Sequence, residues 1–178
     1  MSLSRVDFDA ICESDLAELV DALIPEDQHL DYKRDVYGSA TGDRKELLKD
    51  VSAFANVNGG HIVIGISEAK GVATDLCGIQ HADVGAEILR IEHIINSGIE
   101  PRIPGFKVRS VHLASGSDAI VMRIPKSWRA PHRVRFDNWN KFWIRNSAGA
   151  HEASMDELRT LFTLSASTID RARAFRAE

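Results

Sequence analysis

The chain has 178 residues, of which 44% are hydrophobic and 27% are charged, and its formal net charge is -4 at pH 7. These values are ordinary for a globular protein and exclude a disordered or fibrous chain. The length predicts one domain, because compact domains usually contain about 100 to 200 residues. The two cysteines, Cys12 and Cys77, have no nearby cysteine partner, which argues against a disulfide framework and a cysteine zinc site.

The sequence shows no sign of a membrane or export segment. No apolar run approaches the roughly 18 residues needed to span a bilayer, and the N-terminus MSLSRVDFDA lacks the apolar stretch of a signal peptide. We therefore predict no membrane partner and a cytoplasmic location. The chain ends in a helical pattern, TIDRARAFRAE, without a stop signal. We expect this C-terminal helix, residues 164–178, to lead into a further downstream region.

The first predicted element is an acidic helix within residues 1–25. Apolar residues in DFDAICESDLAELVDALI recur at three- and four-residue spacing, and Pro25 marks the end of the pattern. From Asp7 to Asp31 there are nine acidic residues and no Lys or Arg. Such a surface suits a basic partner, including a basic region of the same protein.

The next segment, HLDYKRDV, alternates as a half-buried strand does. Leu30 and Tyr32 are expected to point to one face. Asp31 and Lys33 are expected to point to the other face, together with His29. This places a carboxylate and an ammonium group side by side on the less apolar face of the strand.

A helix is predicted from about Arg44 to Val57, followed by two glycines and the strand HIVIGIS. Its inward residues are Leu47, Leu48, Val51 and Phe54. Gly59 and Gly60 supply the permissive backbone that a helix C-terminus often requires. A phosphate loop instead runs from a strand into a helix N-terminus, and the sequence lacks GxxxxGK[ST]. We therefore interpret the glycines as a packing feature and expect no ATP use.

The second half of the chain predicts a helix at residues 82–99, hairpins at 107–125 and 133–145, and a short terminal helix. The hairpins are expected to turn through SGSD and DNWN. Ser154 and Glu157 have the three-residue spacing of a capping box at the start of the last helix. This order of elements predicts an α+β fold with a mixed, largely antiparallel sheet and flanking helices.

Three stretches together resemble the Schlafen AlbA-like domain family. They are DYK at residues 31–33, SAFANVNGGHIVIGI at residues 52–66, and FWIRNSAGAHEAS at residues 142–154, which a short helix follows. The resemblance covers roughly Glu26 to Phe162, so we expect a domain at residues 26–163. It implies DNA or RNA binding in a regulatory protein, as in bacterial members. In the Schlafen branch it implies cleavage of structured RNA by a metal-assisted carboxylate cluster.

The resemblance also implies which carboxylates would form that cluster. Glu26 and Asp31 have the five-residue spacing of the branch's first pair, and Glu68 follows the glycine-containing strand. Asp31 stands where Glu is usual and Glu68 where Asp is usual. Together they would hold Mg²⁺ or Mn²⁺, with Lys33 neutralising charge that develops on the phosphate. The alternative is that Glu26 and Glu68 are solvated loop acids and Asp31 pairs with Lys33 on its own strand face.

The region from residue 123 to residue 145 is basic and aromatic, with seven Lys or Arg, one acid and all three tryptophans. Basic side chains contact phosphates, and exposed aromatic rings stack on bases. The residues predicted to bind nucleic acid are Arg123, Lys126, Trp128, Arg129, Arg133, Arg135, Trp139, Lys141 and Arg145. The alternative is that Phe142 and Trp143 fill the core and the cations form a solvated hairpin face. For Arg145, a phosphate contact and a packing salt bridge both remain open.

Three functions from different classes therefore remain. The leading hypothesis is a DNA- or RNA-binding domain of a regulatory protein, which uses the basic and aromatic region. The first alternative is a divalent-metal-dependent endoribonuclease that uses Glu26, Asp31, Glu68 and Lys33. The second is an interaction or homodimerisation module, in which the acidic N-terminal helix docks on a basic surface of a second copy.

Overall fold

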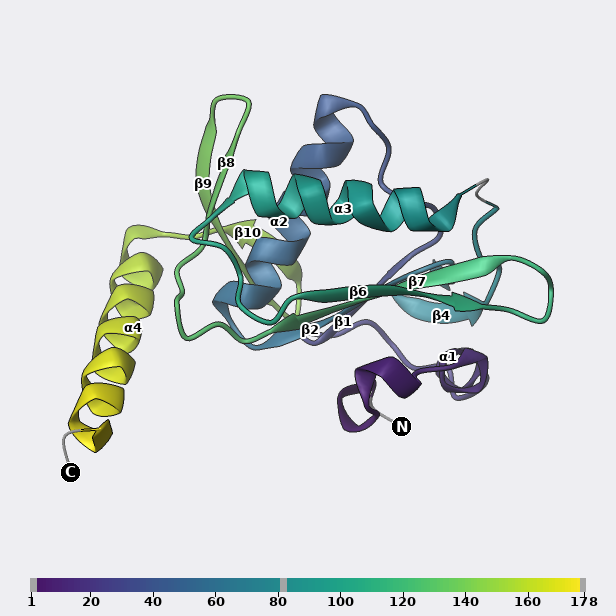
Figure 1. Cartoon of the computed structure of the whole chain (residues 1–178), viewed down its shortest axis with the longest axis horizontal. Coiled ribbons are helices and arrows are strands. Elements are labelled where there is room, and N and C mark those ends of the chain that lie inside the picture. Colours follow the sequence, from purple (N-terminus) through teal and green to yellow (C-terminus); the bar gives the residue numbers. More distant parts are fainter. Residues whose placement is uncertain (1–2, 81–82, 177–178) are drawn as a thin grey trace.

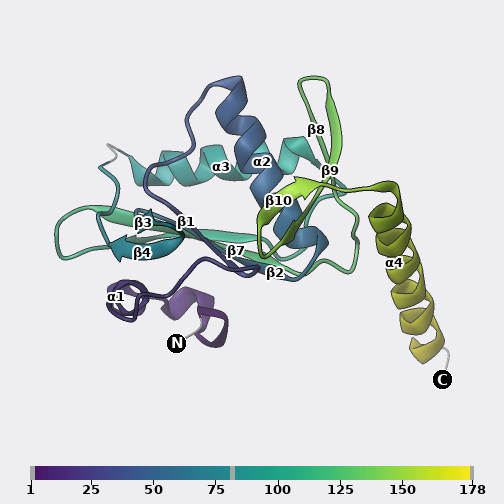
Figure 2. The ribbon, with the colours of Figure 1, turned by 180° about the vertical axis from the view of Figure 1, so that it is seen from behind.

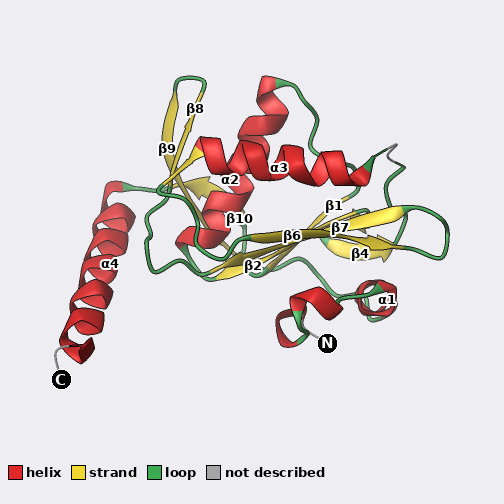
Figure 3. Cartoon of the chain, in the orientation of Figure 1, coloured by secondary structure: helices red, strands yellow, loops and turns green. Residues whose placement is uncertain are grey.

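The computed structural model describes residues 3–80 and 83–176, with side chains described as far as residue 165. Within these residues four α-helices accompany strands that form three sheets (Figures 1 and 3). The helices are α1 (Glu13–Asp21), α2 (Thr41–Asn56), α3 (Val84–Gly98) and α4 (Met155–Arg176). The strands are β1 (Leu30–Lys33), β2 (Gly59–Ile64), β3 (Ser67–Ala69), β4 (Val72–Asp75), β5 (Ile99–Glu100), β6 (Lys107–His112), β7 (Asp118–Pro125), β8 (Arg133–Phe136), β9 (Trp139–Asn146) and β10 (Gly149–Glu152). The predicted α+β class is confirmed.

The central sheet has the strand order β1-β2-β7-β6. β1 pairs with β2 in parallel, and the other pairings are antiparallel. The parallel pair is possible because the long connection between its strands contains α2. In Figures 1 and 2, α2 and α3 lie over one face of this sheet, and α1 with the N-terminal segment lies against the other.

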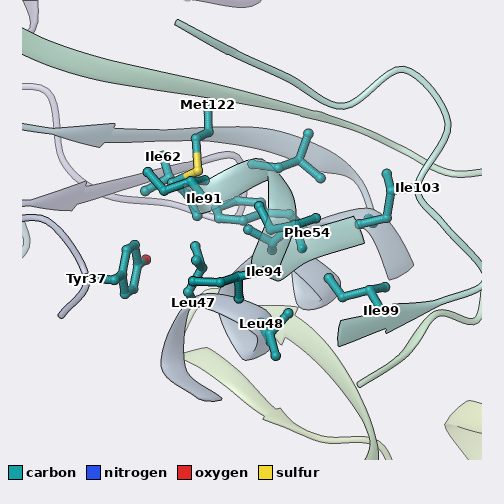
Figure 4. Close-up of a cluster of buried hydrophobic side chains, with 14 of the residues drawn as sticks. Tyr37, Leu47, Leu48, Phe54, Ile62, Ile91, Ile94, Ile99, Ile103 and Met122 are labelled. Carbon is teal, nitrogen blue, oxygen red and sulfur yellow. The ribbon is translucent and has the colours of Figure 1, made fainter. Parts of the chain in front are cut away.

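Alternation along the strands gives this sheet an apolar cluster on each face. Ile62 and Ile64 of β2 belong to the cluster under α2 and α3, whereas Val63 belongs to the cluster under the N-terminal segment. Figure 4 shows the first cluster, in which Phe54 from α2 and Met122 from β7 are both buried. A strand that is buried on both faces is the reason that β2 reads as a continuous apolar run.

The second sheet has the order β10-β9-β8-β5 and packs against α2. Its β8–β9 hairpin projects away from the central sheet (Figure 1). The hairpin turns at Asp137 and Asn138, with φ of 44° and 64°, a left-handed conformation that Asp and Asn adopt more readily than most residues. The turn is tighter than the predicted DNWN, so Trp139 already belongs to β9.

The junction between α2 and β2 explains the two glycines. Gly59 has φ of +69°, and a Cβ there would lie 2.4 Å from the backbone N of Lys126. A Cβ on Gly60 would lie 2.4 Å from the carbonyl oxygen of His29 and 2.6 Å from the ring of Phe54. Real Cβ atoms do not approach other atoms this closely, so the glycines permit both the reversal and the close packing. The interpretation of the pair as a packing feature is confirmed.

The N-terminal helix is shorter than predicted. Phe8–Ala10 forms a single 3-10 turn, Ile11 is extended, and α1 begins only at Glu13. The carboxylate of Asp15 accepts the backbone N–H of Cys12 at 2.9 Å. This reciprocal cap fixes the start of α1 and separates it from the turn.

The last helix begins as predicted but continues further. Ser154 N donates to Glu157 Oε2 at 2.8 Å, and Glu157 N donates to Ser154 Oγ at 3.3 Å, which confirms the capping box. α4 runs on to Arg176, so the boundary expected after residue 163 lies inside one helix. Residues 1, 2, 82, 177 and 178 of the predicted helices lie outside the described residues. Among those described, no helix is long and apolar enough to cross a membrane.

Candidate functional site

A polar cavity of about 250 Å³ lies beside β1, α2 and the β9–β10 turn. It contains four of the predicted site residues, Glu26, Asp31, Lys33 and Arg145. The charged residues that line it are Glu26, Asp27, Asp31, Lys33, Glu46, Lys49, Asp50 and Arg145. Five carboxylates therefore face three cations, and this excess of negative charge disfavours a polyanion inside the cavity.

Asp31 is the centre of the cavity's ion pairs. Its Oδ1 accepts a hydrogen bond from Arg145 Nη2 at 2.9 Å, and its Oδ2 lies 2.6 Å from Lys33 Nζ. Asp31 and Arg145 are only 6% and 8% exposed. The guanidinium of Arg145 also lies over the ring of Phe54, 4.4 Å from its centroid. Both cations thus compensate a carboxylate that would be costly to bury alone.

Asp50, on α2, is a second buried carboxylate of the cavity. Its Oδ2 accepts a hydrogen bond from the Tyr37 hydroxyl at 2.9 Å and lies 3.7 Å from Lys33 Nζ. Burial raises the pKa of Asp50, although Lys33 and Lys49 act in the opposite direction. Burial acts to lower the pKa of Lys33, but Asp50 and Asp31 outweigh it and raise that pKa. Lys33 is therefore held as a cation between two carboxylates.

Asp50 is not among the site residues predicted from the sequence. Asp50 comes three residues after Leu47 and four before Phe54, so it falls on the inward face of the predicted helix. A carboxylate on an otherwise apolar face is the signal that could have identified it, because a buried charge needs a partner.

Glu26 and Glu68 both approach the backbone of Gly71. Glu26 Oε1 accepts the backbone N–H of Tyr32 at 2.7 Å, and Glu68 accepts the backbone N–H of Gly71. A Cβ on Gly71 would lie 3.6 Å from Glu26 Oε2. Burial raises the pKa of Glu26, and the charges of Asp31 and Glu68 raise it further, whereas the bond from Tyr32 lowers it. Glu68 is thus near enough to act on Glu26 but does not line the cavity.

This arrangement does not fit a divalent metal. Both oxygens of Asp31 already face cations, Arg145 and Lys33, and one oxygen each of Glu26 and Glu68 accepts a backbone N–H. Among the described residues, no three His, Cys, Asp or Glu side chains gather as a metal site requires. No step that depends on Mg²⁺ or Mn²⁺ follows from these positions.

The predicted nucleic-acid-binding residues divide into three groups, the first of which is on the β8–β9 hairpin. Arg133 Nη2 lies 2.9 Å and Arg135 Nη1 3.8 Å from Glu100 Oε2, while Lys141 Nζ lies 2.6 Å from Glu152 Oε2. Trp139 is half-buried against the core, with Lys141 Nζ 5.7 Å from its ring centroid. The hairpin therefore presents exposed cations beside an aromatic surface.

The second group lies on β7 and the loop after it. Lys126, Trp128 and Arg129 are exposed, and the Arg129 guanidinium lies 5.8 Å from the centroid of the Trp128 ring. Arg123 is half-buried because the N-terminal segment covers it: its Nη2 donates to the carbonyl of Leu3 at 2.8 Å. The third group is Arg145 alone, in the cavity described above.

Comparisons with known proteins identify the family of this architecture. A family model described as Schlafen, AlbA_2 matches residues 26–154 of the chain. A comparison with curated proteins finds no significant match. Among solved structures, the chain is similar to the DIP2311 protein from Corynebacterium diphtheriae, with a TM-score of 0.52 and 13% sequence identity over 79% of this chain. The match spans 29% of that protein's length and, at this identity, is a likeness of fold alone.

Proposed function

The chain belongs to the Schlafen AlbA_2 family, and we propose that it binds nucleic acid through the basic and aromatic side chains of residues 123–145. The family is associated with DNA or RNA binding in regulatory proteins. The proposal places the bound strand on the β8–β9 hairpin and the neighbouring loop. It keeps the strand out of the polar cavity, whose carboxylates outnumber its cations.

The main support for this proposal is that the ion pairs of the hairpin are exposed to solvent. The side chains of Arg135 and Glu100 are 69% and 55% exposed, and those of Lys141 and Glu152 are 37% and 52% exposed. Exposed pairs of this kind contribute about 0 to 1 kcal/mol each. A phosphate can therefore replace the carboxylate at low cost, and the release of counterions from the nucleic acid favours the exchange.

The aromatic residues supply the other half of the surface. Trp139 and Trp143 pack at 5.5 Å between ring centroids, and Lys45 Nζ and Lys141 Nζ lie 5.1 Å and 5.7 Å from the centroid of Trp139. Trp128 is 57% exposed. The exposed ring of Trp128 gives a base a surface to stack on without selecting a sequence, whereas Trp139 and Trp143 are half-buried. Binding that tolerates many sequences and weakens with salt is the expected behaviour.

Fluorescence polarisation with labelled single- and double-stranded DNA and RNA tests this function. We expect binding whose affinity falls as salt rises, and a clear loss when Arg133 and Arg135 are both replaced by glutamate. A matched control replaces Lys70 and Arg159 by glutamate, which changes the net charge equally on the β3–β4 turn and α4, outside the hairpin. No salt-sensitive binding by the wild type, or equal losses in both double variants, would refute the proposal.

Cleavage of RNA is the second candidate function, because Glu26, Asp31 and Lys33 share one cavity; its dependence on a divalent metal is the part that the described residues do not support. The raised pKa of Glu26 suits a group that exchanges a proton. Because the positions of the carboxylates do not fit a metal site, cleavage should also be measured in the presence of a chelator, which removes the metal.

Structured RNA incubated with Mg²⁺, with Mn²⁺ or with EDTA separates the two candidates. Cleavage that is lost in Glu26→Gln, and also in Asp31→Ala, would favour the enzyme. Glu26→Gln is the safer of the two variants, because its amide oxygen can still accept the N–H of Tyr32. Intact RNA under all three conditions, with binding retained, would favour the binding module.

A further inference from the structure

A second polar pocket, of about 210 Å³, lies where β2 begins and β7 ends. The backbone of Gly59 and Gly60 forms part of its wall, and Ser4 of the N-terminal segment lies at its edge. Every ionisable side chain that lines it is basic or imidazole: His29, His61, Arg123 and Lys126. The first cavity has an excess of carboxylates, whereas no carboxylate among the described residues lines this pocket, and its cations favour an anion.

The guanidinium of Arg123 is held in place before any ligand binds. Its Nε donates to His61 Nε2 at 2.8 Å, and its Nη2 donates to the carbonyls of Leu3 and Val6 at 2.8 Å and 2.9 Å. The ring of Phe8 lies 5.1 Å from its central carbon. None of these bonds uses Nη1. The arginine is thus fixed on one side and retains donors on the other, as a phosphate-binding arginine does.

His61 is the residue that holds Arg123 from inside the protein. It is 4% exposed, and burial together with the charge of Arg123 lowers its pKa to about 4. The imidazole is therefore neutral at physiological pH, and its Nε2 can accept the N–H of Arg123. His61 acts as a positioning residue for the guanidinium.

His29 and Lys126 complete the pocket from two exposed loops. His29 Nδ1 lies 3.3 Å from the carbonyl oxygen of Gly59 and must donate to it, because a carbonyl only accepts. This bond orients the imidazole ring. Lys126 lines this pocket and also the neighbouring apolar groove that contains Trp128. Lys126 therefore lies between the anion pocket and the exposed ring of Trp128.

We propose that this pocket, beside His29, binds a phosphate group of a nucleic-acid strand through Arg123 and Lys126, and that Trp128 stacks on a base beside that phosphate. The proposal rests on the proposed nucleic-acid binding and assigns one subsite within it. Arginine and lysine provide charge-assisted donors to phosphate oxygens. The exposed indole provides the adjoining surface for a base.

Inorganic phosphate, followed by amide chemical shifts in ¹H–¹⁵N NMR spectra, tests the pocket directly. We expect saturable shifts at Gly59, Gly60 and His61 in the wild type, and their loss when His29 and Lys126 are both replaced by glutamine. These two side chains are exposed, so the variant should stay folded. Shifts confined to other regions of the protein would overturn the proposal.

Polarisation with a labelled oligonucleotide tests whether the phosphate belongs to a strand. The double variant His29→Gln and Lys126→Gln should bind about tenfold more weakly, with a smaller dependence on salt, because the cationic contact of Lys126 to phosphate is lost. Trp128→Ala should weaken binding without changing the salt dependence. Lys70→Gln, on the turn between β3 and β4, is the control and should bind as the wild type does.

The outcomes separate this inference from the broader proposal. Wild-type binding that the double variant fully retains would overturn the pocket while nucleic-acid binding stands. A wild type that binds inorganic phosphate at Gly59 and Gly60 but binds no oligonucleotide would overturn both the proposed nucleic-acid binding and the assignment of the pocket to a strand phosphate. It would instead identify a site for a small phosphorylated ligand.

Discussion

Asp31 and Arg145 are 114 residues apart in the sequence and form a buried ion pair, with Oδ1 and Nη2 at 2.9 Å. Asp31 is on β1 of the central sheet and Arg145 is on β9 of the second sheet. The pair therefore joins the two sheets at the polar cavity. Because each partner is buried, removal of either one leaves a charge with too little compensation.

The first prediction concerns this ion pair. Replacement of Arg145 by methionine should lower the free energy of unfolding by about 3 kcal/mol, the lower end of the usual cost, because Lys33 still compensates Asp31. Methionine keeps an apolar stem over Phe54. The control is Lys141→Met, whose pair with Glu152 is exposed and should contribute less than about 1 kcal/mol. Urea denaturation followed by circular dichroism measures both, and equal losses would contradict the argument.

Features that depend on neighbouring residues are predicted from the sequence, whereas contacts between residues far apart in the chain are not. The junction of α2, Gly59 and β2 is predicted because the helix stop and the alternation lie within a few residues of each other. Only one of the two partners of Asp31 is a local signal of this kind. Lys33 is two residues away on the same strand, whereas Arg145 lies on β9 of the second sheet. For Arg145 the sequence leaves both a phosphate contact and a packing salt bridge open, and the burial beside Asp31 that forms the salt bridge depends on how the two sheets pack.

The N-terminal segment shows the same limit. Its apolar spacing predicts a buried face, and Phe8 is indeed 3% exposed. The spacing does not reveal the break at Ile11, where the chain becomes extended before α1. Nor does it show that backbone carbonyls at Leu3 and Val6 accept bonds from Arg123, since carbonyls occur at every residue and leave no sequence signal.

The second prediction concerns the pH dependence caused by Glu26. Its pKa is raised in the folded protein, first by burial, so the folded chain binds a proton more tightly than the unfolded chain. Stability therefore falls as pH rises from the ordinary value of 4.5 to the folded value. Glu26→Gln removes this loss, so the variant should gain stability relative to the wild type as the pH is raised from about 4 to about 7.

Glu157 provides a control of opposite sign. Its pKa is lowered by the backbone N–H of Ser154, so it contributes stability above its ordinary pKa and loses it as the pH falls. Glu157→Gln should therefore become less stable relative to the wild type as the pH rises. Urea unfolding at several pH values measures both variants, and trends of the same sign would be inconsistent with these environments.

The third prediction concerns His61. Its folded pKa is about 4, against 6.5 for an ordinary histidine. Between these values the unfolded chain binds a proton that the folded chain does not, so stability falls as the pH falls through this window. The full effect is about 3 kcal/mol, from about 1.4 kcal/mol per pKa unit. His61→Gln can still accept the N–H of Arg123 and should remove this acid-sensitive part, as unfolding curves at about pH 4 and about pH 7 would show.

The last prediction compares two glycines. A Cβ on Gly60 would meet the carbonyl oxygen of His29 at 2.4 Å and the ring of Phe54 at 2.6 Å, and neither the backbone oxygen nor a buried ring can easily move. Gly60→Ala should therefore cost about 1 to 3 kcal/mol, the usual range for overpacking. A Cβ on Gly42, inside α2, would meet no heavy atom within 4 Å from elsewhere in the described part of the chain. Gly42→Ala should instead stabilise the protein by about 0.5 to 1 kcal/mol, because alanine favours a helix. Thermal unfolding of the two variants measures the difference, and a stabilised Gly60→Ala would show that β1 and β2 are not packed as closely as this junction requires.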